Sequence, residues 1–197
     1  MKSYFDSIPS MHNPTQFLSE GQINDILESM ENPRDKVLFT FLAYTGRRIS
    51  EVVRCLKPRD IYSEEKMINT TFLKKRKPFK DLLPINEKAF DMLLSWINNQ
   101  GIGRDDYIFP ISRQQVDRIF KRYCYKLDIM TIGDGERNMP HVHLLRHSFA
   151  IMIAKRCRTL EDIYSLQRLM GHSKLEQTMW YINHFNPTAQ RELLKRM

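Results

Sequence analysis

The chain has 197 residues and carries 31 lysines and arginines against 23 aspartates and glutamates, which gives a formal net charge of +8. Its hydrophobic content of 42% is enough for a sizeable core, so the composition excludes an intrinsically disordered chain. A basic balance of this size favours a polyanionic partner, because protein cations displace counterions from phosphates, although an ordinary basic protein fits the charge equally well.

Cysteine usage and hydropathy indicate where the protein works. The three cysteines form no CxxC pair and are odd in number, which is typical of a reduced, intracellular protein. No apolar run approaches the roughly 18 residues of a membrane span, and the first residues lack the apolar core of a signal peptide. We therefore expect a cytoplasmic protein without a membrane segment.

The first predicted elements are helices with recognisable starts. Residues 1–15 contain prolines and small polar residues, which indicates a tail or a short arm. Ser19 and Gln22 are spaced like the two members of a capping box, and apolar residues follow at helical spacing. Pro33 fits the first position of a second helix, which we expect to end at Gly46, and a third helix follows it.

The clearest strand signal is a pair of apolar segments, 67–73 and 81–85, on either side of a basic connector, 74–80. This pattern predicts a β-hairpin with a charged turn. Residues 128–140 have the composition of a turn-rich loop. The remaining segments have helical patterning, and we expect helices at 87–99, 113–127, 143–156, 160–170, 175–183 and 188–196. The predicted fold class is mainly α with a small antiparallel β-hairpin or sheet, an α+β domain.

Three separated segments contain residues that are suited to phosphate chemistry. They read TGRRISEV from Thr45, HLLRHSFA from His143, and LMGH from Leu169, with Tyr181 nine residues after His172. Taken singly, each segment is more typical of a structural turn or of a buried side chain on an amphipathic helix. Tyr181, for example, also fits a core aromatic position beside Trp180.

Together and in this order, the segments resemble the tyrosine recombinase (lambda-type integrase) family. The family's first box, T-G-x-R-x-S-E, places its arginine at Arg48. The second box, H-x-L-R-H-S/T-x-A, places its histidine and arginine at His143 and Arg146. The third box, an L-G-H element followed nine residues later by the nucleophilic tyrosine, places His172 and Tyr181. The resemblance covers about residues 16–186.

The sequence departs from the family pattern at two places. Met170 stands where leucine is usual in the third box. The family's lysine lies on a hairpin turn between the first two boxes, where Lys74 fits, but the turn is crowded and Lys75 competes for the role. Because only about 15 residues precede the first helix, the chain resembles the short members, such as fimbrial-switch inverting recombinases. We therefore expect a catalytic domain over residues 16–197.

The resemblance implies a site-specific DNA recombinase that works by transesterification. Tyr181 would attack a DNA phosphate and form a 3′-phosphotyrosyl link, which the 5′-hydroxyl of a partner strand would then reverse. Two guanidinium groups suit charge stabilisation at phosphorus, a histidine can exchange protons at working pH, and a lysine can protonate the leaving 5′ oxygen. No cofactor and no metal are expected. The expected partners are double-stranded DNA and a homotetramer on paired sites, formed from monomers or weak dimers.

Other interpretations remain open at this point. A type IB topoisomerase would use similar chemistry without strand exchange, and a non-catalytic DNA-binding regulator would be expected to lack one of the six residues. His143 and His147 stand one helical turn apart like a zinc pair, but Leu144 replaces the glutamate of H-E-x-x-H. The candidate DNA-binding residues are Lys75, Arg76 and Lys77 on the hairpin turn, and Arg113, Arg118 and Arg122 on one predicted helix. These arginines could follow phosphates or simply face water.

Overall fold

The computed structural model describes residues 17–73, 78–133 and 136–186, and it is mainly helical. The helices are α1 (Glu20–Glu28), α2 (Pro33–Thr45), α3 (Ile49–Cys55), α4 (Glu87–Gln100), α5 (Arg113–Lys126), α6 (His143–Ala154), α7 (Leu160–Met170) and α8 (Leu175–Phe185), with a 3-10 turn, η2 (Pro58–Asp60). The strands are β1 (Ile61–Tyr62), β2 (Met67–Phe72), β3 (Phe79–Pro84), β4 (Thr131–Gly133) and β5 (Glu136–Asn138).

The predicted fold class is confirmed. The hairpin β2–β3 is antiparallel, with Phe72 opposite Phe79, and β1 adds a third strand in the order β1-β2-β3. Burial alternates along β2, where Ile68, Thr70 and Phe72 are buried, and this period-2 pattern explains why the sequence reveals the strand. The tail 1–15, the turn 74–77 and the predicted helix 188–196 fall outside the described residues.

One prediction is wrong. The segment 128–140, expected to be a loop, contains the antiparallel strands β4 and β5, which pair Ile132 with Arg137. The two strands have three residues each, and Ile132 is exposed although it is apolar. In a hairpin this short, the buried residue Thr131 is polar and the apolar Ile132 is exposed, so the sequence displays no alternating hydrophobic pattern.

The helix starts follow the sequence closely. The Ser19 hydroxyl accepts a hydrogen bond from the Gln22 backbone N–H at 3.2 Å, and the Gln22 side chain accepts one from the Ser19 N–H at 3.0 Å, so the capping box is formed. Pro33 occupies the first turn of α2, after the N-cap residue Asn32. Helix α2 ends at Gly46, whose φ of 61° is the left-handed conformation that glycine adopts without strain.

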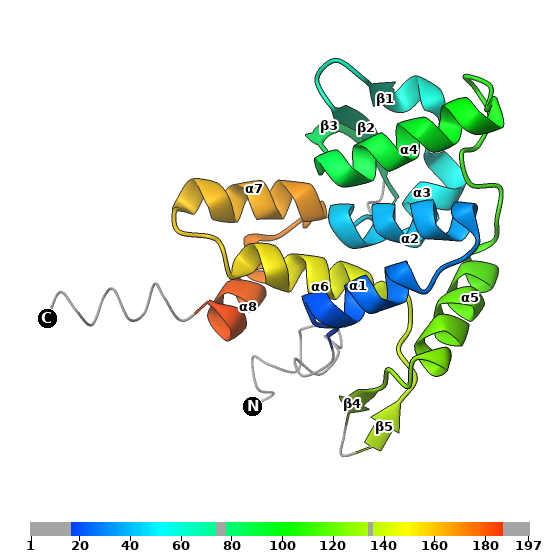
Figure 1. The fold of residues 1–197 in the computed structure, drawn as a ribbon. Coiled ribbons are helices and arrows are strands. Elements are labelled where there is room, and N and C mark those ends of the chain that lie inside the picture. The colour runs from blue at the N-terminus through cyan, green and yellow to red at the C-terminus, as the bar shows by residue number, and fades with distance from the viewer. Residues whose placement is uncertain (1–16, 74–77, 134–135, 187–197) are drawn as a thin grey trace, which may run out of the picture.

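Two helices organise the interior. Helix α2 lies between α4 and α6 and is buried on nearly all sides, as its apolar composition around the whole circumference requires (Figure 1). Helix α6 contacts α2, α7 and α8. Its first half, with Leu144 and Leu145, belongs to the main core, and its second half, with Phe149 and Ala150, belongs to a second cluster with α7 and α8. The segment HLLRHSFA therefore lies where the two cores meet.

The turn after α7 depends on a close approach between Gly171 and the sheet. Gly171 has a φ of 59°, and a Cβ there would overlap the Phe72 ring of β2. Gly101, which ends α4, has the same φ, but no atom lies within 4 Å of its Cβ position. The left-handed angle at Gly171 and its close approach to Phe72 therefore hold the next residue, His172, near the sheet.

We expect Gly171→Ala to destabilise the fold more than Gly101→Ala. Both variants should lose about 1–2 kcal/mol because an alanine must adopt a left-handed conformation. Only Gly171→Ala should lose about 1–3 kcal/mol more, because its methyl group displaces Phe72. Urea unfolding of the two variants measures the difference, and equal losses would contradict the close contact.

Candidate active site

Arg48 is held by a carboxylate that also contacts the hairpin. It is the N-cap residue of α3, and its backbone N–H donates to Oε2 of Glu51 at 3.1 Å, while its Nη1 donates to Oε1 at 3.0 Å. Oε1 of Glu51, which is buried, also accepts from the N–H of Leu73 at 3.4 Å. Glu51 therefore joins the first sequence box to the end of β2, immediately before Lys74.

The two neighbouring arginines of this box have different environments. The Arg47 side chain points into the interior, where its guanidinium lies 5.0 Å from the Phe72 ring centroid and its Nε donates to the carbonyl of Thr45. Burial lowers the pKa of Arg47 to about 10. The Arg48 side chain keeps 19% of its surface exposed, so Arg48 is the one that can reach a ligand.

Arg146 connects all three sequence boxes. Its Nη1 donates to the carbonyl of Gly46 at 2.6 Å, and its Nη2 donates to the carbonyl of Met170. The first carbonyl ends α2 and the second ends α7, so one guanidinium fixes the turns that carry Arg48 and His172. Burial lowers the pKa of Arg146 to about 9, with a smaller contribution from the like charge of Arg48, and the group stays charged at neutral pH.

His143 begins α6 and stands against a second histidine. Its ring meets the His147 ring edge to face, with centroids 4.9 Å apart. Burial, with smaller contributions from the charges of His147 and Arg146, lowers the pKa of His143 to about 2. His143 is therefore neutral over the whole working range, so it can accept or donate a hydrogen bond but carries no charge.

Tyr181 lies on α8 with only 4% of its surface exposed. Its hydroxyl oxygen is 2.7 Å from Nδ1 of His147, close enough for the O–H to donate to that nitrogen. Burial raises the pKa of the Tyr181 phenol to about 12, although the nearby charges of Arg146 and Arg48 act in the opposite direction. The hydroxyl is thus a protonated, positioned group beside two guanidinium ions.

His172 completes the group. Its ring stacks on the Tyr181 ring with centroids 6.1 Å apart and an interplanar angle of 5°. Its Nδ1 lies 3.0 Å from the hydroxyl oxygen of Thr178, a buried residue of α8, and this contact sets the orientation of the ring. The turn at Gly171 and the helix α8 therefore bring His172 and Tyr181 of the third box next to the second box on α6.

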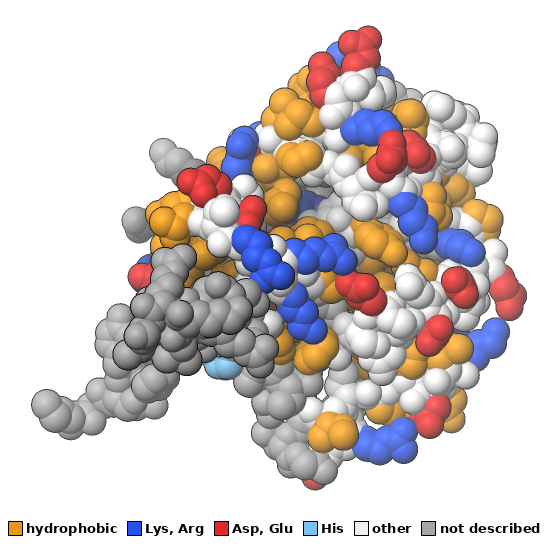
Figure 2. All heavy atoms as spheres, turned by 60° about the vertical axis from the view of Figure 1, so that its left-hand side comes forward, with side chains coloured by type: hydrophobic (Ala, Val, Ile, Leu, Met, Phe, Trp, Pro, Cys, Tyr) orange, Lys and Arg blue, Asp and Glu red, His pale blue; other side chains and the backbone are white. Residues whose placement is uncertain are grey.

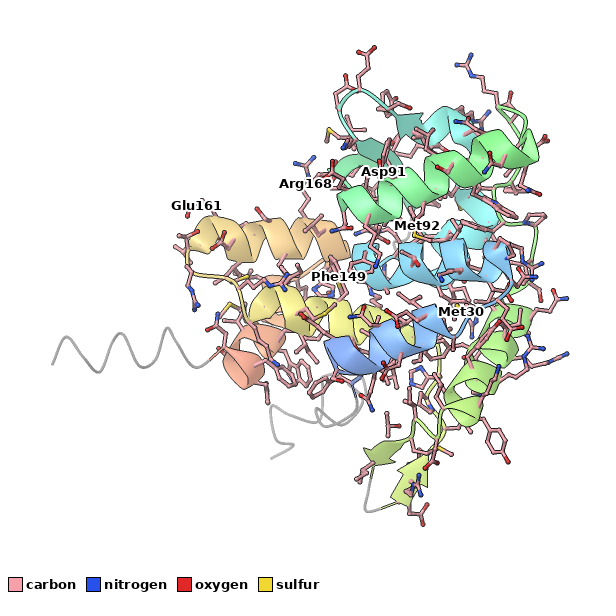
Figure 3. The ribbon with its side chains drawn as sticks, viewed as in Figure 1. Met30, Asp91, Met92, Phe149, Glu161 and Arg168 are labelled. Carbon is pink, nitrogen blue, oxygen red and sulfur yellow. The ribbon has the colours of Figure 1, made fainter. Side chains whose placement is uncertain are left out.

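The structure brings five of the six sequence-predicted catalytic candidates into one cluster, namely Arg48, His143, Arg146, His172 and Tyr181. Lys74, with Lys75, Arg76 and Lys77, lies outside the described residues. The strand after that turn is tied to α7, because Arg168 donates from Nε and Nη2 to the two carboxylate oxygens of Asp81, both at 2.8 Å; Figure 3 labels Arg168. This pair holds the pKa of Asp81 below its usual value.

The three predicted DNA-binding arginines lie on α5, and all three are exposed: Arg113, Arg118 and Arg122. The helix is close to the candidate site at one point, since Oδ1 of Asp117 accepts from the N–H of Val142 at 3.0 Å, next to His143. Lys121 and Lys126 on the same helix pair with protein carboxylates, at 2.9 and 3.4 Å. A DNA contact by the arginines remains a prediction.

A separate cavity of about 390 Å³ lies among α1, α2, β2, β3 and α6. Its lining includes Tyr44, Leu83, Phe149 and Met152, and Figure 3 places Phe149 between α7 and α2. Figure 2 shows hydrophobic side chains gathered near the middle of this side of the molecule, with basic side chains around them. The Tyr181 cluster does not line this cavity.

Sequence reasoning missed three polar partners in the site. It assigned His147 only to an unfavoured zinc pair, and it gave no role to Glu51 or Thr178. The sequence does contain a signal for two of them, because His147 and Glu51 both belong to the boxes that carry the resemblance. Within the described ranges, the structure holds no group of three or more His, Cys, Asp or Glu side chains that could bind a metal ion. It also has no helix there with the length and apolarity that a bilayer crossing requires.

A helical domain that gathers two arginines, two histidines and a buried tyrosine defines a candidate phosphoryl-transfer site. The chain belongs to the phage integrase family, whose model matches residues 16–187. A tyrosine recombinase of Pseudothermotoga lettingae is 30% identical over 172 residues, which cover 85% of this chain and 56% of that protein. Tyrosine recombinase XerH of Campylobacter jejuni is 24% identical over 184 residues, covering 87% and 49%. The chain thus spans about half the length of these relatives.

Solved structures confirm the fold. The crystal structure of XerA recombinase superposes with a TM-score of 0.70 at 24% identity, covering 96% of this chain and 65% of that one. A pre-cleavage complex of XerH with its difH substrate gives a TM-score of 0.66 at 21% identity, covering 88% and 51%. The described domain therefore has the architecture of a recombinase catalytic region.

Proposed function

We propose that the protein is a site-specific recombinase that cleaves and rejoins double-stranded DNA through a 3′-phosphotyrosyl intermediate on Tyr181. The observation that carries the proposal is the cluster itself: a positioned phenol beside Arg48 and Arg146 and between two histidines. Family membership supports the same reaction, and XerH, a relative, has been crystallised on its DNA substrate. The cytoplasmic location expected from the sequence is part of this proposal.

The two arginines would stabilise the transition state. Phosphoryl transfer asks mainly for positioning and for compensation of negative charge on the non-bridging oxygens. A guanidinium has five N–H donors, so Arg146 can hold the carbonyls of Gly46 and Met170 and still donate to a phosphate oxygen. Arg48 is aimed by Glu51 and is partly exposed, which suits a second contact to the same phosphate.

His172 and His143 would orient the reacting groups. His172 is fixed by Thr178 and stacks on the nucleophile's ring, so it limits the directions in which the phenol can point. His143 is neutral and can share a hydrogen bond with a phosphate oxygen without repelling the arginines. With these roles taken by the histidines, the lysine of the hairpin turn would supply the proton that the leaving 5′ oxygen takes up.

Covalent capture tests the proposed function. The probe is a pool of nicked DNA duplexes with randomised sequence, in which cleavage near the nick releases a short strand and traps the enzyme. We expect an adduct that survives denaturing gels, with the protein on a 3′ end and a free 5′-hydroxyl on the released strand, which a polynucleotide kinase can label. Failure to form any adduct with the pool, or attachment to a 5′ end, would contradict the proposal.

The same captured sequences separate the rival activities. Once a preferred sequence is known, two differently sized duplexes that carry it should give recombinant products. A type IB topoisomerase would instead relax a supercoiled plasmid without exchanging strands between duplexes. A non-catalytic regulator would bind the sequence and form no adduct.

Lys74 is the predicted general acid. Lys74→Ala should slow cleavage of ordinary DNA by about 10²–10⁴, the usual range for general acid catalysis. A substrate with a bridging 5′-phosphorothiolate should restore the rate, because the sulfur leaves without a proton. The matched control is Lys75→Ala on both substrates, and rescue of the Lys75 variant alone would transfer the role to Lys75.

We also propose that the active form is a homotetramer on paired DNA sites, assembled from monomers or weak dimers. The segment 187–197 contains Leu193, Leu194 and Met197, and the helix that the sequence predicts at 188–196 would need a surface for its short apolar face. Truncation after Asn186 should weaken assembly on paired sites in a gel-shift assay and leave the circular dichroism spectrum unchanged. An unfolded truncated protein would show that the segment belongs to the domain's own core.

A further inference from the structure

We propose that His147 is the immediate proton acceptor for Tyr181 in strand cleavage, a role that the sequence analysis did not give to this residue. This inference rests on the proposed function and adds a catalytic residue to it. Its starting point is one contact: Nδ1 of His147 lies 2.7 Å from the Tyr181 hydroxyl oxygen, a normal hydrogen-bond length between oxygen and nitrogen.

The other two histidines of the site are placed for different tasks. The His172 ring is nearly parallel to the phenol ring, at an angle of 5°, with the two ring centroids 6.1 Å apart. Its Nδ1 is already 3.0 Å from Thr178. His143 meets the His147 ring edge to face and so supports it from the side.

The environment makes a proton acceptor necessary. Tyr181 is buried, and its pKa near 12 means that only about one phenol in 10⁴ is ionised at pH 8. A neutral imidazole has one ring nitrogen that accepts hydrogen bonds, so a neutral His147 can take the proton while the phenol oxygen attacks. Among the described residues, the other titratable or charged groups around the pair include His143 and Arg146 on α6, His172 after α7, and Arg48 before α3.

Strand cleavage moves one proton from Tyr181 to His147 and a second proton from the hairpin lysine to the leaving oxygen. The Tyr181 oxygen forms a bond to phosphorus as its O–H bond breaks, and the proton moves to Nδ1 of His147, which becomes imidazolium. The P–O5′ bond breaks, and the leaving oxygen takes a proton from the hairpin lysine. In rejoining, the incoming 5′-hydroxyl gives its proton to the lysine, and the imidazolium returns its proton to the departing phenolate.

Two substitutions separate proton transfer from positioning. In His147→Asn the side-chain amide can occupy the place of Nδ1 and keep the hydrogen bond to Tyr181, but it cannot carry the proton. His147→Ala removes the ring and leaves space for added imidazole. The matched control is His184→Asn on α8, because His184 is an exposed histidine whose Nδ1 contacts the carbonyl of Trp180 and not the phenol.

The measurement is the single-turnover rate of adduct formation on the nicked duplex pool, taken from about pH 5.5 to 9 to span the histidine range. We expect His147→Asn to be slower by about 10²–10⁴ and to lose the fall in rate on the acid side. Imidazole should accelerate His147→Ala and have no effect on His147→Asn. His184→Asn should behave like the unmodified protein.

Two results would overturn the inference. A His147→Asn variant with the rate and pH profile of the unmodified protein would show that another group takes the proton. A slow variant that keeps the acid-side fall, with no imidazole rescue of His147→Ala, would reduce His147 to a positioning residue. If the unmodified protein itself forms no adduct, the proposed function fails, and that outcome is distinguishable from both.

Discussion

Tyr181→Phe is expected to abolish covalent adducts while leaving the protein folded and bound to DNA. The substitution removes the hydroxyl oxygen and keeps the ring, which packs against His172 and, with centroids 5.0 Å apart, against Trp180. The lost hydrogen bond to His147 should cost about 0.5–1.5 kcal/mol, which a stable domain tolerates. Gel shift and denaturing gels on the same nicked duplexes measure binding and covalent attachment separately.

Tyr164→Phe is the control for this experiment. Tyr164 lies on α7 with 56% of its surface exposed, far less constrained than the buried Tyr181. The control should form adducts at the normal rate. Persistent adducts in Tyr181→Phe would move the nucleophile to another tyrosine, with Tyr123, Tyr125 and Tyr164 as the next candidates.

Arg146→Lys should give the second large effect, a fall in cleavage rate of about 10²–10³, comparable to removal of one transition-state hydrogen-bond donor. A lysine has one ammonium group and cannot donate to Gly46, Met170 and a phosphate oxygen in the geometry of a planar guanidinium. The two carbonyls lose part of their hydrogen bonding, so stability should also fall, by about 1–3 kcal/mol.

Arg47→Lys separates the loss of cleavage rate from the loss of stability. Arg47 is as buried as Arg146, at 4% exposure each, but it packs on Phe72 and belongs to no predicted contact with DNA. We expect it to lose stability in urea and to keep its cleavage rate per folded molecule. Equal cleavage rates for Arg146→Lys and Arg47→Lys would contradict the role of Arg146 in the chemistry.

Local signals in the sequence were sufficient for the first helix starts and for the β2–β3 hairpin. The capping box at Ser19, the proline at the start of α2 and the alternation along β2 each describe contacts between residues that are close in the chain, and all three are formed. The β4–β5 hairpin could not be predicted, because its strands have three residues each and carry no periodic hydrophobic pattern.

The site could be predicted in part, through the family resemblance and not through periodicity. The boxes identify the residues that the structure gathers around Tyr181, but they do not say which of them touch. Arg146 binds carbonyls 100 and 24 residues away, and His147 meets Tyr181 across 34 residues. Such contacts depend on how α6, α7 and α8 pack, and packing has no signature in a single sequence.

The central claim is that Tyr181 becomes covalently attached to DNA, and peptide mapping of the captured adduct tests it most directly. After nuclease and protease digestion, mass spectrometry should find the nucleotide mass on the peptide that contains Tyr181, with fragment ions that place it on the phenol oxygen. An adduct on any other residue, or an active preparation in which the Tyr181 peptide carries no nucleotide, would contradict the account.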